Sequence, residues 1–264
     1  MKRIASLLLA VFLSTEASAD GIEVDLELVL MVDVSRSMTE RELEIQRRGY
    51  AAALRSEAVY EAVQSGLLQR VALSYVEWSS TQKVIVDWRV LEKPSDLQSF
   101  ASALTATFNP VLRRTSISEA LIFGAQSIER NTYDGLRKVI DVSGDGPNNL
   151  GRPVTTARDR VLAKGIVING LPLMTREGMG SQWHLDDLDD YYRSCVVGGP
   201  GAFVIPVLDW SDFAEAVKRK LILEIAAAPS EPQLHHAQYT PRAPYDCMIG
   251  EKIWEDLRRT WDTP

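Results

Sequence analysis

The fold is decided by residues 26–37, which read LELVLMVDVSRS. The first seven of these residues form a nearly unbroken apolar run, as expected for a strand that helices cover on both faces. Thr39 and Glu42 then form a capping box at the start of a long helical pattern that extends to about residue 64. A buried strand that leads into a helix is typical of an α/β protein with a parallel sheet.

The same alternation of strands and helices continues along the chain. The strands at 71–78 and 84–90 are joined by a short connection, which predicts an antiparallel hairpin. Further strands are predicted at 139–143, 166–171 and 202–207, and further helices at 95–104, 116–130, 155–164 and from 211 onward. We therefore predict an α/β fold with a doubly wound, mostly parallel sheet, one antiparallel edge strand and helices on both faces.

The two ends of the chain differ in character from the middle. Residues 1–19 combine two basic residues, an apolar run and a small-residue cleavage site, which is typical of a secretory signal peptide. The apolar run is too short to span a bilayer, and the alternative is an ordinary N-terminal core helix. We expect one domain at 20–227 and a proline-rich tail at 228–264 with a short helix near 251–259. No other stretch is long and apolar enough to span a membrane, so we expect a secreted, periplasmic protein.

The net charge bears on the class of partner, and the two cysteines bear on a possible disulfide. The formal net charge is −7 and no basic face is evident, so nucleic-acid binding is not expected. Both cysteines, Cys195 and Cys247, follow the predicted leader. In an oxidising compartment they predict one disulfide that ties the tail to the domain, the alternative being two unpaired thiols.

Polar side chains follow the predicted strands at the sheet edge where ligands bind in such folds. Asp33, Ser35 and Ser37 come directly after the first strand, and alternate positions in an extended turn point in the same direction. Asp145 follows a later strand and is flanked by glycines, which permit a tight bend. Thr115 stands just before a helix. We expect these side chains, from three loops, to converge.

The converging side chains offer only oxygen atoms, with neither sulfur nor imidazole among them. Such hard donors suit Mg²⁺, Mn²⁺ or Ca²⁺ rather than Zn²⁺, and we expect Mg²⁺ first. Two carboxylates only just balance a divalent cation, and the set leaves a coordination position for water or a guest. Such a cation can accept a carboxylate from a protein partner in spite of the protein's own negative charge.

The order of these residues resembles the metal-ion-dependent adhesion site (MIDAS) of von Willebrand factor type A (VWFA) domains. The matching residues are DxSxS at 33–37, Thr115, and Asp145 within SGDG at 143–146. The resemblance covers about residues 24–227. The segments VEWS at 76–79, VSGDG at 142–146 and GGPGAF at 198–203 further resemble a bacterial secreted branch of the family with no assigned function.

The resemblance implies the doubly wound fold and a bound divalent cation. Asp33, Ser35, Ser37 and Thr115 would coordinate the cation directly or through water, and Asp145 would lie one layer behind or reach it through water. Members of the family bind protein ligands, commonly through a partner Asp or Glu that completes the metal shell, and are seldom catalysts. The resemblance therefore implies a secreted, metal-dependent protein-binding module.

Two arginines depart from the family pattern. Arg113 and Arg114 stand directly before Thr115, where many members have glycines. These cations would either recruit an anionic partner or only cap the site with charge.

Simpler roles for the candidate residues remain open. Ser35 and Ser37 could be helix caps, and Asp145 could be only a turn residue. Asp141 lies within a predicted strand, where burial demands a partner, so we expect it to form hydrogen bonds rather than to bind metal. The glycine-rich loop at 198–201 precedes a strand rather than a helix and is interpreted as a turn.

Two further groups of polar residues could bind metal but favour other roles. The acidic cluster near Trp183 and His184 could form a second metal site, and a solvated helix face is the preferred interpretation. Its members are Asp186, Asp187, Asp189 and Asp190. His235 and His236 lie in the proline-rich tail without further ligands and are interpreted as solvated.

Two other functions are kept as alternatives. A metal-assisted hydrolase would need a general base near the cation, for which Asp145 or Asp141 could serve, because no histidine maps to this site. A serine hydrolase is less compatible, since the sequence contains no G-x-S-x-G turn. The third possibility is a structural domain with a degenerate site, against which the complete set of ligands argues.

Overall fold

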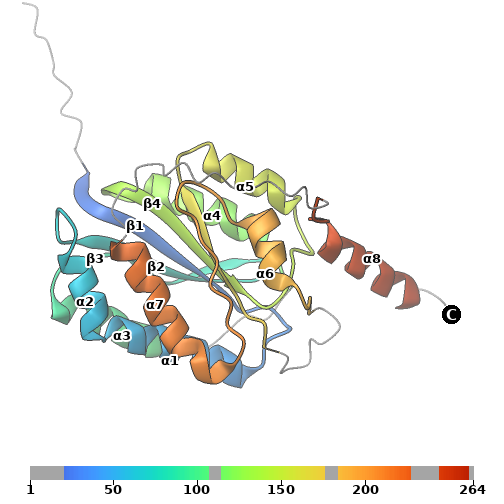
Figure 1. Cartoon of the computed structure of the whole chain (residues 1–264), viewed down its shortest axis with the longest axis horizontal. Coiled ribbons are helices and arrows are strands. Elements are labelled where there is room, and N and C mark those ends of the chain that lie inside the picture. Colours follow the sequence, from blue (N-terminus) through green and yellow to red (C-terminus); the bar gives the residue numbers. More distant parts are fainter. Residues whose placement is uncertain (1–20, 107–113, 176–183, 227–243, 262–264) are drawn as a thin grey trace, which may run out of the picture.

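A five-stranded sheet forms the centre of the described part of the computed structural model (Figure 1). The described residues are 21–106, 114–175, 184–226 and 244–261. The strands are β1 (Ile22–Asp33), β2 (Val71–Trp78), β3 (Gln82–Leu91), β4 (Tyr133–Gly144) and β5 (Val167–Pro172). Their order is β3-β2-β1-β4-β5, and each neighbouring pair is parallel except β2 with β3. The predicted mostly parallel sheet with one antiparallel edge strand is confirmed.

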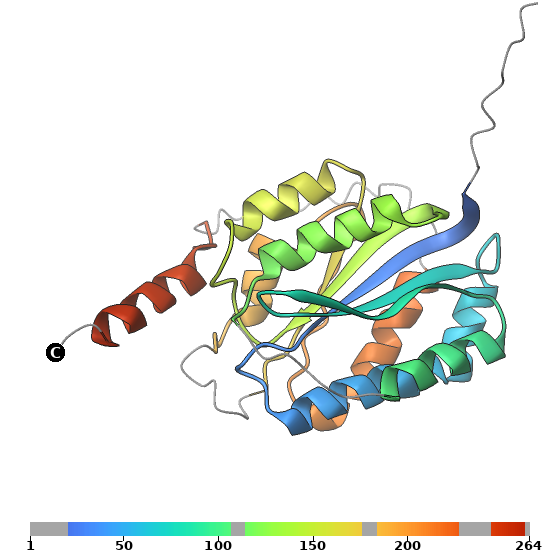
Figure 2. The same ribbon diagram turned by 180° about the vertical axis from the view of Figure 1, so that it is seen from behind.

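Alternate residues of β1 face two separate hydrophobic cores. Leu28 and Leu30 belong to one core, and Val29 and Met31 belong to the other. The first core is covered by α1 (Glu40–Leu54), α2 (Glu57–Gln64), α3 (Pro94–Thr105) and α7 (Phe213–Ala226). The second is covered by α4 (Ile117–Arg130), α5 (Val154–Leu162) and α6 (Leu188–Tyr191). Helices therefore cover both faces of the sheet, as predicted (Figure 2).

The strand register aligns the carboxyl ends of the central strands. Val32 of β1 pairs with Ser143 of β4, and Asp33 pairs with Trp78, the last residue of β2. The loops after β1 and β4 therefore leave the sheet side by side at the same edge. This alignment places the predicted site residues of the two loops near one another.

Two predicted elements differ in the structure. The helical pattern at 39–64 forms two helices, α1 and α2, because the chain turns after Leu54 and Ser56 caps α2 by accepting a hydrogen bond from Val59 N at 3.4 Å. The predicted strand at 202–207 forms only isolated bridges, from Val204 to Gly170 in β5 and from Val207 to Leu173 directly after it. Pro206 lies between them and has no N–H group to extend a ladder.

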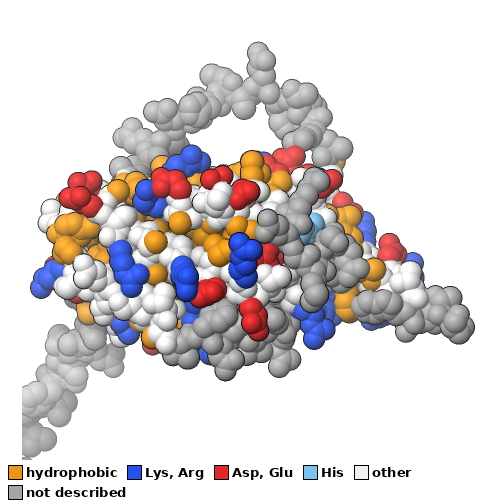
Figure 3. All heavy atoms as spheres, turned by 90° about the horizontal axis from the view of Figure 1, so that it is seen from below, with side chains coloured by type: hydrophobic (Ala, Val, Ile, Leu, Met, Phe, Trp, Pro, Cys, Tyr) orange, Lys and Arg blue, Asp and Glu red, His pale blue; other side chains and the backbone are white. Residues whose placement is uncertain are grey.

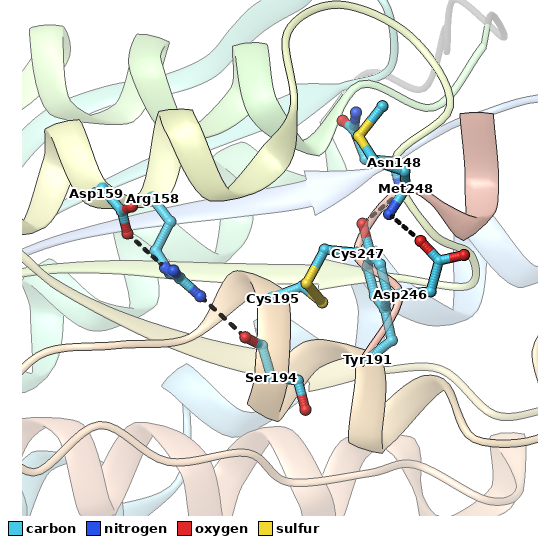
Figure 4. Close-up of a disulfide and its surroundings, with 9 residues drawn as sticks. All are labelled: Asn148, Arg158, Asp159, Tyr191, Ser194, Cys195, Asp246, Cys247 and Met248. Carbon is cyan, nitrogen blue, oxygen red and sulfur yellow. Dashed lines mark hydrogen bonds and ion pairs between the residues drawn. A yellow bond between two sulfur atoms is a disulfide. The ribbon is translucent and has the colours of Figure 1, made fainter. Parts of the chain in front are cut away.

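A disulfide between Cys195 and Cys247 ties a C-terminal segment to the body of the domain, as predicted (Figure 4). Cys195 lies in a π-helical turn directly after α6, and Cys247 precedes α8 (Ile249–Trp261). This helix includes the one predicted near 251–259 and extends away from the sheet (Figures 1 and 2). The predicted leader at 1–19 lies outside the described residues. None of the helices in the described ranges is long and apolar enough to cross a membrane.

Candidate metal centre

Asp33 is the last residue of β1 and is completely buried. Its backbone is held in place because Gln46 Nε2 donates to its carbonyl at 3.0 Å and Val34 N donates to the Trp78 carbonyl at 2.8 Å. Its carboxylate Oδ1 accepts a hydrogen bond from Ser35 N at 2.7 Å. The end of β1 and the loop after it therefore have a defined geometry.

A chain of hydrogen bonds joins this loop to the loop after β4. Ser35 Oγ and Ser37 Oγ lie 3.0 Å apart, and Ser37 Oγ donates to Asp145 Oδ1 at 2.7 Å. Ser35 and Asp145 are both buried. The structure thus brings together Asp33, Ser35, Ser37 and Asp145 from two separate loops.

Thr115, the remaining predicted ligand, is buried directly before α4. Its carbonyl accepts a hydrogen bond from Asn149 N at 3.1 Å, and Ser116 Oγ donates to the Leu150 carbonyl at 2.9 Å. Thr115 therefore lies against the loop that begins at Asp145. Within the described ranges, its hydroxyl forms no hydrogen bond with the other four predicted ligands.

Neither carboxylate of the site is paired with a lysine or arginine among the described residues. Burial, followed by the charge of Asp145, raises the pKa of Asp33 well above its usual value. Burial also raises the pKa of Asp145, against the hydrogen bond from Ser37. Asp33 Oδ2 is buried without a hydrogen-bond partner among the residues that the structure describes. Buried carboxylates and an orphaned oxygen atom fit a site for a divalent cation.

Gly144 keeps space open beside the Asp33 carboxylate. A Cβ atom at this position would lie 2.8 Å from Asp33 Oδ2 and 2.8 Å from the Tyr192 hydroxyl oxygen. The Tyr192 hydroxyl is also buried and forms no hydrogen bond with any residue that the structure describes. A larger residue would displace the carboxylate, so this glycine is required by close approach.

His184 lies beside the site, although the sequence pattern associated it only with the acidic cluster at 186–190. Its Nε2 lies 4.0 Å from Asp145 Oδ2, so the expectation that no histidine lies near the site is wrong. Among the described residues, the Nε2 atom has no hydrogen-bond partner. Both side chains line a pocket of about 170 Å³ whose walls include Leu173, Leu185 and Leu208. No sequence spacing identifies His184, because only the path of the chain after β5 brings it to Asp145.

Of the acidic residues that follow His184, Asp186 lines the same pocket, and two others pair with an arginine. Asp189 and Asp190 lie 2.5 and 3.2 Å from Arg193 on the same short helical segment. No three His, Cys, Asp or Glu side chains in the described ranges form a cluster that could hold a metal ion. His235 and His236 lie outside the described residues. On the face drawn in Figure 3, side chains of both charges are interspersed with hydrophobic ones.

Asn148 fixes the loop that begins at Asp145, a role that no sequence motif indicated. Its side chain accepts a hydrogen bond from Ser118 N at 3.0 Å and donates one to Glu251 Oε1 at 2.7 Å. Its backbone N donates to the Tyr191 hydroxyl at 3.1 Å. The loop is thereby linked to α4, α6 and α8.

Arg114 supports the same region from the other side. Its guanidinium donates a hydrogen bond to the Asn149 carbonyl and lies 3.9 Å from the centre of the Trp254 ring in α8. Burial, with the nearby charge of Arg258, lowers the pKa of Arg114. This arginine is engaged by the loop and by α8, and Arg113 lies outside the described residues.

A buried ion-pair network joins β4 to α7. Lys220 Nζ lies 2.6 Å from Asp141 Oδ1 and 2.6 Å from Glu224 Oε1, and all three side chains are buried. Burial and then the charge of Glu224 raise the pKa of Asp141 to about 7, against the effect of Lys220. Burial lowers the pKa of Lys220, but the two carboxylates outweigh it and raise that pKa. Asp141 therefore binds a partner inside the protein.

Comparison with known proteins places the chain in a family. The family model described as "Protein of unknown function (DUF1194)" matches residues 23–229. The chain belongs to the DUF1194 family. The match extends from β1 of this DUF1194 protein through α7. No curated protein matches the sequence.

Solved structures show that the DUF1194 protein has a VWFA-like fold. The open form of the pilus adhesin SpaC from Lactobacillus rhamnosus GG has a TM-score of 0.57 at 14% identity, covering 76% of this chain and 30% of SpaC. Proximal thread matrix protein 1 from the mussel byssus, with a zinc-occupied MIDAS motif, gives 0.53 at 13%, covering 78% and 49%. A von Willebrand factor type A protein from Catenulispora acidiphila gives 0.53 at 12%, covering 76% and 43%. The chain spans less than half of each of these proteins, and such identities show the fold alone.

Proposed function

We propose that this DUF1194 protein is a metal-ion-dependent protein-binding module that acts outside the cytoplasm, in the periplasm. Asp33, Ser35, Ser37, Thr115 and Asp145 hold a divalent cation, and a carboxylate from a partner protein completes its coordination. The binding domain comprises residues 20–227, with 1–19 removed as a leader and 228–264 forming a tail.

The observation that carries this proposal is the hydrogen-bond chain from Ser35 through Ser37 to Asp145, beside the orphaned Oδ2 of Asp33. The chain fixes two hydroxyl groups and two carboxylates at the edge of the sheet. Taken alone, these oxygen donors favour Mg²⁺, with Mn²⁺ or Ca²⁺ as the next candidates.

The electrostatics of the site are compatible with a bound cation. Burial raises the pKa values of both Asp33 and Asp145, and a nearby positive charge would favour the state in which both are ionised. A bound divalent cation supplies that charge and a position that accepts a carboxylate. The hydroxyl groups of Ser35, Ser37 and Thr115 are neutral ligands. They add no negative charge at the ion that would repel an acidic partner.

The structural neighbours support the same kind of function. SpaC is named as a pilus adhesin and proximal thread matrix protein 1 as a matrix protein, and one structure of the latter contains zinc in its MIDAS motif. A metal-occupied MIDAS motif and an adhesin therefore both occur on the fold that this chain adopts.

The function is tested by capture of proteins from a cell-envelope extract on the immobilised protein. We expect EDTA to abolish the capture and added Mg²⁺ or Mn²⁺ to restore it. An Asp- and Glu-rich peptide should compete with the captured protein, and Asp33→Ala should capture nothing. Capture that neither EDTA nor Asp33→Ala changes would contradict the proposal. A panel of esters and phosphoesters runs alongside, and cation-dependent turnover that Asp33→Ala abolishes would favour a metal-assisted hydrolase instead.

A further inference from the structure

A pocket of about 420 Å³ lies at the opposite end of β4 from the metal site. Tyr133, the first residue of β4, lines this pocket, whereas Asp145 directly follows the last residue of the same strand. The rest of the lining comes from β3, from the segment that leads into β4 and from the last two turns of α4, which runs along the nearer face of the sheet in Figure 2. Sites for small molecules have volumes of about 300–1,000 Å³, and this pocket falls within that range.

Aromatic rings form one part of the pocket lining. The rings of Trp88 and Tyr133 have centroids 6.4 Å apart and planes inclined by 51°, and Phe123 adds a third ring. Trp88 Nε1 donates a hydrogen bond to Ser127 Oγ at 2.8 Å, which holds the indole in one orientation and satisfies its N–H group. Trp88 and Tyr133 are half-buried, so part of their apolar surface is accessible at the pocket.

Polar side chains form the other part of the lining, and their charges cancel. Of the described residues that line the pocket, Asp87 is the acidic one and Arg130 the basic one, and both are exposed. Asp87 offers only hydrogen-bond acceptors and Arg130 only donors, whereas the amide of Gln126 offers both. The described lining thus has no net charge and can exchange hydrogen bonds in both directions.

This lining favours a ligand that is uncharged and rich in hydroxyl groups. A purely apolar molecule would remove water from Asp87 and Arg130 without giving them a new partner. An anion would be repelled by Asp87 and a cation by Arg130. A hydroxyl group both donates and accepts hydrogen bonds, and a sugar ring also presents C–H groups that pack on aromatic rings by dispersion.

We propose that this pocket binds an uncharged saccharide, at a site separate from the metal site. One face of the sugar packs on Trp88 and Tyr133, and its hydroxyl groups exchange hydrogen bonds with Asp87, Gln126 and Arg130. The described lining shares no residue with the proposed metal ligands, so saccharide binding does not depend on the cation. The two ends of β4 thus carry two different binding sites.

The test is saturation-transfer difference NMR on the full chain with the neutral disaccharides maltose, cellobiose, lactose and chitobiose. We expect the C–H protons of at least one of them to be saturated, because those protons pack on the rings. In calorimetry with that disaccharide, Gln126→Ala should bind about two- to tenfold more weakly, as expected for the loss of one hydrogen bond. Trp88→Ala should bind at least about tenfold more weakly, because it removes a stacked ring. Glu129→Ala, at an exposed position of α4 outside the pocket, is the matched control that binds as wild type does.

Variants of the two charged residues test the preference for a neutral ligand. Asp87→Asn leaves the described lining with a net positive charge and should add binding of glucuronic acid. Arg130→Gln leaves it with a net negative charge and should add binding of the cationic sugar glucosamine. Wild type should bind both charged sugars more weakly than the neutral disaccharide.

Several results would overturn the saccharide site. One is that no neutral disaccharide binds, and another is that Gln126→Ala and Trp88→Ala bind as tightly as Glu129→Ala. A third is tighter binding of free glycine or phenylalanine, whose opposite charges would meet Asp87 and Arg130, than of any saccharide. Loss of saccharide binding in EDTA would place the sugar at the metal site and overturn the proposal as well. Saccharide binding in a protein that binds no cation would contradict only the proposed metal-dependent function.

Discussion

Ser37 Oγ donates a hydrogen bond of 2.7 Å to Asp145 Oδ1, across 108 residues of sequence. This bond links the loops after β1 and β4, which carry the two carboxylates of the site. Because Ser37 Oγ also lies 3.0 Å from Ser35 Oγ, one hydroxyl group connects three of the predicted ligands. The site is therefore held in shape by its own side chains.

Replacing Ser37 with alanine should weaken cation binding far more than it weakens the fold. Loss of one hydrogen bond costs about 1 kcal/mol of unfolding free energy, whereas the cation loses a ligand and Asp145 loses the donor that orients it. We expect at least about tenfold lower cation affinity by calorimetry. Ser102→Ala, which removes an exposed hydroxyl on α3, is the matched control. A Ser37→Ala protein with undiminished cation affinity would contradict this assignment.

Replacing Lys220 with methionine should destabilise the protein strongly. The change leaves Asp141 and Glu224 buried without their cationic partner, which costs about 3–5 kcal/mol of unfolding free energy. Urea denaturation measures this loss. The control is Lys218→Met, because Lys218 forms a partly exposed pair with Glu215 on the same helix and should contribute less than about 1 kcal/mol. Equal effects of the two substitutions would show that the buried network does not hold α7 in place.

The network also predicts a pH dependence. The pKa of Asp141 is about 7 in the folded protein and 3.8 ordinarily, so between these values the folded chain retains a proton that the unfolded chain has lost. The contribution of this group to stability therefore falls as pH rises through that window, by up to about 1.4 kcal/mol per pH unit. Asp141→Asn removes this titration.

Urea denaturation of wild type and Asp141→Asn across the same window tests this prediction. The free energy of unfolding of wild type, relative to the variant, should decline with rising pH. Asp159→Asn, at an exposed aspartate, controls for the loss of a surface carboxylate. A relative stability that rises with pH would mean that the charged form of Asp141 is the one that the fold favours.

The C-terminal helix should influence cation binding through Asn148. Glu251→Ala removes the acceptor of the 2.7 Å hydrogen bond from Asn148 Nδ2, and the loop that begins at Asp145 loses a support. We expect weaker cation affinity in Glu251→Ala and recovery in Glu251→Gln, whose amide oxygen still accepts the bond. Glu255→Ala, at an exposed position of α8, should bind the cation normally. Equal affinities in Glu251→Ala and Glu255→Ala would exclude this role for α8.

The sequence predicted those parts of the fold that depend on local patterns. The nearly unbroken apolar run at 26–32 predicted a strand covered on both faces, and the short link after Trp78 predicted an antiparallel neighbour. The prediction was wrong where the apolar pattern of the sequence continues past the end of a helix or through a residue that cannot extend a strand. Apolar spacing persists across Ser56 although the helix ends there, and the run around Pro206 resembles a strand although proline cannot extend the ladder.

Only those residues of the candidate site that belong to a recognisable sequence motif could be predicted. Asp33, Ser35 and Ser37 lie within five residues of one another, and Asp145 stands at the end of a recognisable strand. His184 and Glu251 reach the site through the path of long connections and through a disulfide-tied tail. Such positions leave no periodic signal in the sequence, because tertiary packing alone determines them.

The central claim, that these loops bind a divalent cation, is tested most directly by calorimetric titration of wild type and Asp33→Ala with Mg²⁺, Mn²⁺ and Zn²⁺. Asp134→Ala, at an exposed position at the start of β4, is the control. We expect saturable binding of a cation to wild type and to Asp134→Ala, and no binding to Asp33→Ala. Absence of binding to wild type, or undiminished binding to Asp33→Ala, would contradict it.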